Sequence, residues 1–95
     1  MKKQYCAILG DILEYERDNM DDPEMGIDEA LGWHKQDVYD IEIHLFGVKF
    51  VSYEIPNEYC VVVELDIEID VDNPEDDLKE VEDFLLKTFV LKPVK

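Results

Sequence analysis

The stretch Tyr59-Cys60-Val61-Val62-Val63-Glu64-Leu65-Asp66-Ile67-Glu68-Ile69-Asp70 decides the fold of this chain. Apolar side chains occupy every second position from Tyr59 to Ile69, and carboxylates occupy the alternate positions from Glu64 onward. Successive side chains of a strand point to opposite faces of its sheet, so this alternation predicts a long strand. One face of that strand would be apolar and buried, and the other would be acidic.

Two further strands are expected before it. Val38 to Leu45 shows the same alternation, and Val48 to Ile55 follows after a turn at Phe46-Gly47. The pair Pro56-Asn57 suits the centre of the turn into the third strand. The three strands are therefore expected to form an antiparallel meander.

The register of this meander follows from parity. If each turn has an even number of residues, Leu45, Val48 and Leu65 share one row of a continuous apolar face. An odd turn would mix apolar and acidic residues on both faces. The third strand outlasts its partner, so residues 66–72 either project as an edge or pair with another segment such as Phe89 to Leu91.

Helical spacing precedes the strands. A stripe of apolar residues at three-and-four spacing predicts a first helix containing Tyr5, Ile8, Ile12 and Tyr15. Because Gly10 weakens a helix, a short strand over Gln4 to Leu9 followed by a helix is the competing interpretation. Residues 18–26 are expected to form a loop, and a short second helix then runs from Ile27 to about Gly32.

The last helix has the clearest signals. Pro74 suits the first helical position, and the acids that follow complement the helix dipole. Its apolar stripe contains Leu78, Val81, Leu85 and Phe89. With the helices on the apolar sheet face, residues 1–95 are expected to form one α+β domain: two layers, a three-stranded antiparallel meander, and the order ααβββα.

The charge of the chain limits its partners. Twenty-five Asp and Glu oppose nine Lys and Arg, for a net charge of −16, while 46% of residues are hydrophobic and suffice for a core. Direct binding to nucleic acid or to an anionic membrane requires a basic surface, so a basic protein partner is expected. No stretch resembles a signal peptide or a membrane span. Cys6 and Cys60 are expected to be free, buried thiols of a cytoplasmic protein.

Alternate carboxylates are the most informative candidate site. On a strand, side chains of one face are about 6.6–6.8 Å apart. Neighbouring phosphates of a DNA strand are roughly 6–7 Å apart, so the row approximates a phosphate backbone. The competing explanation is an ordinary solvated sheet face. The residues expected to bind a partner are Glu64, Asp66, Glu68, Asp70, Asp72, Asp40, Glu42, Glu75, Asp76, Asp77, Glu80 and Asp83.

Catalytic and metal-binding signals are missing from the sequence. No nucleophile elbow, phosphate-binding loop or zinc motif is present, and the acidic run lacks the glycine of a calcium-binding loop. His34 is expected in a loop, His44 on the polar sheet face, and Trp33 is expected to be partly buried. We therefore expect no enzyme activity, no metal and no cofactor.

These observations favour an acidic mimic of nucleic acid that inhibits a basic DNA- or RNA-binding protein, such as a restriction enzyme or a CRISPR effector. In charge, length and absence of motifs the chain resembles the class of small acidic α+β inhibitors encoded by phages and mobile elements, and nuclease immunity proteins. One alternative is an immunity protein or antitoxin that neutralises a nuclease toxin. Another is a non-catalytic oligomerising structural protein. We expect a monomer or a small homo-oligomer.

Overall fold

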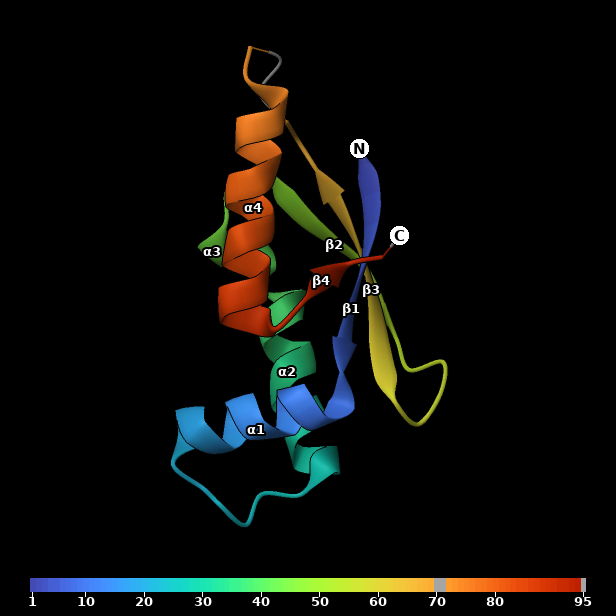
Figure 1. The fold of residues 1–95 in the computed structure, drawn as a ribbon, viewed down its shortest axis with the longest axis vertical. Coiled ribbons are helices and arrows are strands. Elements are labelled where there is room, and N and C mark those ends of the chain that lie inside the picture. Colours follow the sequence, from blue (N-terminus) through green and yellow to red (C-terminus); the bar gives the residue numbers. More distant parts are fainter. Residues whose placement is uncertain (70–71, 95) are drawn as a thin grey trace.

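Over residues 1–69 and 72–94, which the computed structural model describes, the chain forms a four-stranded antiparallel sheet and four helices (Figure 1). The expected α+β class is confirmed, whereas the three-stranded meander and the order ααβββα are wrong. In chain order the elements are β1 Lys2–Ile8, α1 Leu9–Met20, α2 Ile27–Tyr39, α3 Ile41–His44, β2 Val48–Glu54, β3 Cys60–Ile67, α4 Pro74–Phe89 and β4 Lys92–Pro93.

Strand β3 lies inside the sheet, whose strand order is β2-β3-β1-β4. Burial alternates along β3, and its fully buried side chains are Val61, Val63, Leu65 and Ile67. The strand is shorter than expected, because the ladder with β1 and β2 extends no further than Ile67. The alternation therefore predicted the buried face correctly and the length of the strand incorrectly.

Strand β1 replaces the beginning of the expected first helix. Tyr5 and Ala7 are buried directly opposite Val63 and Val61 of β3, which gives the N-terminal segment the period of a strand. The competing interpretation, a strand followed by a helix, is thus correct. Gly10 lies in the first turn of α1, where it interrupts no established helix.

Helix α2 continues past Gly32, where the sequence predicted its end. A glycine inside a helix costs about 1 kcal/mol. Packing outweighs that cost, because α2 buries one residue every four positions. Trp33, expected to be partly buried, is 44% exposed on this helix. The buried stripe consists of Ala30, His34 and Val38.

The strand expected over Val38 to Leu45 is wrong. This segment forms the end of α2 and the short helix α3, in which Ile41 is buried and Ile43 is 80% exposed. Val38 belongs to the buried helical stripe of α2. The alternation in the sequence therefore does not correspond to the two faces of a sheet. Strand β1 pairs with β3 instead, and β2 becomes an edge strand.

Strand β2 is close to its expected bounds but shifted in register. Val48 lies opposite Ile67, two residues beyond the expected Leu65. A bulge between Phe50 and Ser52 then brings Tyr53 opposite Val63. The bulge changes which side chains face the core after Phe50, and no alternation in the sequence marks it.

The end of β3 is paired by neighbours that the sequence did not indicate. The Ile67 amide donates to the Met1 carbonyl, and the Glu68 amide donates to the Gly47 carbonyl, each at 2.7 Å. Gly47 has a φ of 81°, a conformation that glycine adopts without strain. Of the two alternatives for this end, pairing with Phe89 to Leu91 is not found in the described residues, because that segment leads into β4, which pairs with β1.

The core lies between the sheet and the helices. Helix α4 begins at Pro74 as expected, and it buries Val81, Leu85 and Phe89. Figure 1 shows α4 along one side of the sheet, with α1 beyond the lower end of the strands. Among residues 1–69 and 72–94, no helix lies on the opposite face of the sheet, and the central side chains of that face are half-buried. The expected placement of the helices on one face is therefore confirmed.

Candidate functional site

The outward surface of α4 carries a group of exposed carboxylates. Asp76, Glu80 and Asp83 follow one another at four- and three-residue spacing, so they share one side of the helix. The buried stripe of α4 lies on the opposite side, and these three side chains therefore point away from the sheet. We call this set the helical acidic face. Glu75 is also exposed, and like Asp76 it lies in the first turn of α4, where the helix dipole stabilises negative charge.

Glu64 and Asp66 of β3 lie on the sheet face without helices, as expected. Both side chains are half-buried. Asp66 lies between Lys2 of β1 and Lys49 of β2. The register therefore flanks Asp66 with lysines from both adjacent strands, whereas Glu64 lies between Gln4 and Ser52.

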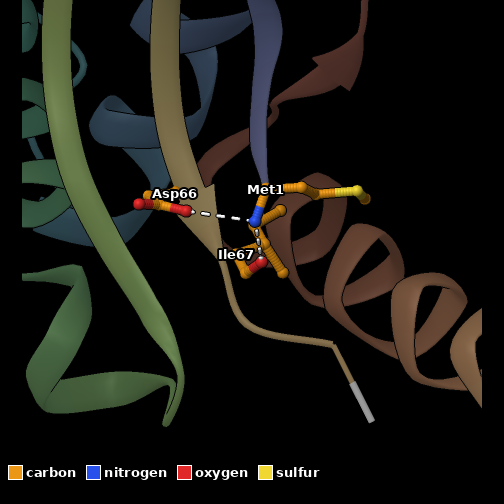
Figure 2. Close-up of polar contacts among 3 residues, drawn as sticks. All are labelled: Met1, Asp66 and Ile67. Atoms are coloured by element: carbon orange, nitrogen blue, oxygen red, sulfur yellow. Dashed lines mark hydrogen bonds and ion pairs between the residues drawn. The ribbon is translucent and has the colours of Figure 1, made fainter. Parts of the chain in front are cut away.

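The N-terminal ammonium group makes a further contact with this row. Figure 2 shows the Met1 nitrogen between Asp66 and the carbonyl of Ile67. The ammonium donates to Asp66 Oδ1 at 3.1 Å and to the Ile67 oxygen at 2.7 Å. Both charged groups of this ion pair are close to half exposed. Asp66 is thus engaged within the chain itself.

The remaining acids of the expected row lie beyond the strand. Glu68 and Asp72 are exposed in the segment that connects β3 to α4, and Asp70 falls outside the described residues. Glu68 lines a small cavity of about 270 Å³ together with Asp77 and Phe46. Carboxylates from the end of β3 therefore meet those at the start of α4.

Asp40 and Glu42 do not join this row. They were expected on a strand, but Asp40 ends α2 and Glu42 lies exposed on α3. Asp40 accepts a hydrogen bond of 2.8 Å from Gln36 Nε2. Their expected alignment with Glu64 is wrong, because the segment that contains them is helical.

A second acidic surface lies on α1 and the loop after it. Glu14, Asp18 and Asp21 line a shallow cavity of about 500 Å³ together with Arg17. Arg17 Nε donates to the Met25 carbonyl at 2.9 Å, which holds the guanidinium against the loop. Figure 1 places this surface at the opposite end of the molecule from the start of α4. The many acids in residues 11–24 were the sequence signal for this second surface, although none of these acids was predicted to bind a partner.

His34, expected in a loop, lies buried on α2. Its Nδ1 accepts a hydrogen bond from the Tyr53 hydroxyl at 2.8 Å, and its Nε2 donates to the Phe89 carbonyl at 2.8 Å. Burial lowers the pKa of His34, so the neutral ring is favoured. With both nitrogens occupied, the ring links α2, β2 and the end of α4. His44, the second histidine, is exposed on α3 rather than on the sheet.

Glu16 is the one buried carboxylate among residues 1–69 and 72–94. Its side chain is 1% exposed, and neither carboxylate oxygen has a hydrogen-bond partner. Burial raises the pKa of Glu16, and the negative charge of Asp37 raises it further. The position follows Ile12 by four residues, and this spacing was the sequence signal that Glu16 faces the core.

Neither a metal centre nor a known relative defines the site. Across residues 1–69 and 72–94, no three His, Cys, Asp or Glu side chains are grouped so as to hold a metal ion. In that part of the chain, no helix has the length and apolar character that crossing a membrane requires. No family model, curated protein or solved structure matches this chain. Function is therefore argued from the surface alone.

Proposed function

We propose that this chain inhibits a basic DNA- or RNA-binding protein by occupying its nucleic-acid groove. The observation that supports the proposal is the exposure of the acids: of the 25 Asp and Glu, 16 are exposed and seven are half-buried. Such a surface attracts a groove lined with Lys and Arg, and it repels nucleic acid itself. Restriction enzymes and CRISPR effectors have grooves of this kind, and a phage or mobile element in a host cytoplasm is the proposed source.

The helical acidic face is the proposed centre of binding. At a rise of 1.5 Å per residue, Asp76, Glu80 and Asp83 are displaced along the helix axis by about 6 Å and then 4.5 Å. Neighbouring phosphates of a DNA strand lie roughly 6–7 Å apart, so the steps are similar. Carboxylates at these positions can form charge-assisted hydrogen bonds with arginine and lysine side chains.

The shape of the molecule is consistent with a groove. Its longest dimension is 46 Å, which corresponds to about 13 steps of duplex DNA at 3.4 Å each. Acidic surfaces lie at both ends of this dimension, on α4 and on α1. Contacts along the whole length would displace a duplex more effectively than a single patch.

The test is inhibition of DNA cleavage by a panel of purified restriction enzymes and CRISPR effectors. We expect at least one target to be inhibited, with an affinity that falls steeply as salt rises. The variant Asp76→Asn, Glu80→Gln, Asp83→Asn should lose most of that affinity. The control Asp28→Asn, Glu29→Gln, Glu58→Gln removes the same charge from exposed positions outside both acidic surfaces and should lose less. Inhibition that is independent of salt, or equal in both variants, would overturn the proposal.

The immunity-protein alternative uses the same acidic surface and differs in the range of targets. It would be supported by tight binding to one nuclease toxin and by no binding to the restriction enzymes and CRISPR effectors of the panel. The structural alternative required two copies to pair edge to edge through the third strand. Strand β3 cannot pair in this way, because it is already paired with β2 on one side and β1 on the other. That route to an oligomer is therefore not proposed.

A further inference from the structure

The uncovered side of the sheet is a surface of a different kind from the acidic helices. Residues paired across antiparallel strands share a face of the sheet. The uncovered side therefore consists of Asp66, Val62 and the other residues of β3 that alternate with them, together with the residues paired to these on neighbouring strands. We call this surface the open sheet face. Its residues are Lys2, Gln4, Cys6 and Ile8 of β1, Cys60, Val62, Glu64 and Asp66 of β3, Lys49, Ser52 and Glu54 of β2, and Lys92 of β4.

The charge of the open sheet face is balanced. Three lysines oppose three carboxylates, so the side-chain charge of this face is zero and the net −16 of the chain lies elsewhere. Two copies of so acidic a molecule repel each other when other surfaces meet. The open sheet face is the surface on which a second copy meets little repulsion.

One half of the open sheet face is apolar. Cys6 lies opposite Val62, and Ile8 lies opposite Cys60. The two pairs are two residues apart, so they are neighbours on this face. Ile8 is 52% exposed, and both cysteines are free and half-buried. These four residues form a contiguous, partly exposed apolar area. Burying such an area against a partner would contribute free energy in proportion to the area removed from water.

We propose that the open sheet face binds a second copy of this chain in a two-fold symmetric, sheet-on-sheet dimer. A two-fold axis parallel to the strands and midway between β1 and β3 sets β1 of each copy over β3 of the other. Lys2 then faces Asp66 of the second copy, and Cys6 faces Val62. Because the axis exchanges the two strands, each favourable pair occurs twice.

The edges of the sheet offer a second copy less than this face does. Strand β4 is two residues long and contains Pro93, which has no amide hydrogen to donate. Strand β2 has a bulge after Phe50, which bends an edge away from regular pairing. The dimer leaves the outer surfaces of α4 and α1 exposed on both copies. The inference does not rest on the proposed function.

Sedimentation equilibrium from low micromolar to millimolar protein tests the proposal. We expect a monomer–dimer equilibrium that strengthens at high salt, because salt screens the repulsion between two acidic molecules. Binding to a basic partner weakens under the same change, so the two proposals can fail separately. A chain that stays monomeric at millimolar concentration in high salt would overturn the dimer.

Matched variants locate the interface. Val62→Asp places a charge at the centre of the open sheet face and should weaken the dimer by a factor on the order of 100. Leu86→Asp adds the same charge on α4, where Leu86 is 46% exposed, and should leave the dimer intact. Equal dimerisation of the two variants, each checked for folding by circular dichroism, would contradict the assigned surface.

Two further measurements apply if Val62→Asp does not fold. Lys2→Glu should weaken the dimer, and Lys2→Glu with Asp66→Lys should restore it, because the exchanged charges face each other again across the axis. Cys6 and Cys60 are the only cysteines of the chain and lie on this face. Their reaction with a thiol reagent should slow as protein concentration rises. A rate independent of concentration, or no rescue by the charge exchange, counts against the dimer.

Discussion

The outer surface of α4 and the open sheet face both carry carboxylates, but in different surroundings. On α4, Asp76, Glu80 and Asp83 are exposed at helical spacing and point away from the rest of the chain. On the sheet, Asp66 is held between two lysines and the N-terminal ammonium. The chemical group is the same in both regions. The comparison shows that the neighbours supplied by the fold decide which carboxylates are available to a partner.

The largest expected difference between the two regions is in affinity for a basic target. Neutralising Asp76, Glu80 and Asp83 should weaken binding on the order of 100-fold, about 2.8 kcal/mol. Glu64→Gln with Asp66→Asn should weaken it only a few-fold, because both carboxylates are half-buried and Asp66 is already compensated by cations. Isothermal titration at protein concentrations where the free chain is monomeric measures both. A larger loss from the sheet variant would reverse the comparison.

Glu82 provides a contrast within α4, because it is half-buried and contacts β1 instead of solvent. Its Oε2 accepts from Lys3 Nζ at 3.0 Å and from the Tyr5 hydroxyl at 2.9 Å. Glu82→Ala leaves the Tyr5 hydroxyl without this acceptor and should cost about 1–2 kcal/mol in urea unfolding. Asp83→Ala, at the next and exposed position, should cost much less. Equal costs would mean that the contact contributes nothing to stability.

Glu16 differs from the acids of both regions because it is buried. Its raised pKa favours the protonated folded form, so its contribution to stability is complete below the ordinary value of 4.5. That contribution is lost as the pH rises through the higher folded value. Glu16→Gln stays neutral, so its stability should exceed that of the wild type at pH 7 by about 1 kcal/mol. The advantage should disappear towards pH 4.

Urea unfolding across this pH range measures the Glu16 effect. The control Glu14→Gln alters an exposed carboxyl of the same helix by the same chemistry, so it corrects for the general repulsion of the acidic chain. A difference between Glu16→Gln and the wild type that does not change with pH would show that folding does not raise the pKa of Glu16.

The smallest expected effect is at Asp66. An ion pair with both partners close to half exposed contributes between zero and about 1 kcal/mol. Asp66→Asn should lower the free energy of unfolding within that range at low salt, and the difference should vanish at high salt. Thermal unfolding at two salt concentrations measures it. A larger loss that persists at high salt would show that Asp66 has a packing role beyond its charge.

The sequence predicted local features better than pairings between distant segments. The buried face of β3 and the start of α4 follow from alternation and from signals within a few residues. The N-terminal segment was ambiguous, because Tyr5 fits both a helical stripe with Ile8 and a strand with Ala7. Pairing with β3 decides between them, and that pairing depends on residues some sixty positions away.

The candidate site shows the same division. The exposure of Asp76, Glu80 and Asp83 follows from helical spacing, and the sequence predicted it. The cations around Asp66 come from β1 and β2 through a register that includes a bulge. No pattern in residues 64–72 marks the Lys2 neighbour, because that contact depends on the pairing of β1 with β3.

The central position of β1 has a consequence for the order of folding. Strands β2 and β3 are joined by a short turn, so their hairpin closes a small loop. Pairing of Lys2 with Asp66 closes a loop of more than sixty residues, which is slower to form. We expect the hairpin and α4 to associate first and β1 to enter the sheet late. Until then, one edge of β3 stays open, and the strand that completes the sheet limits the rate of folding.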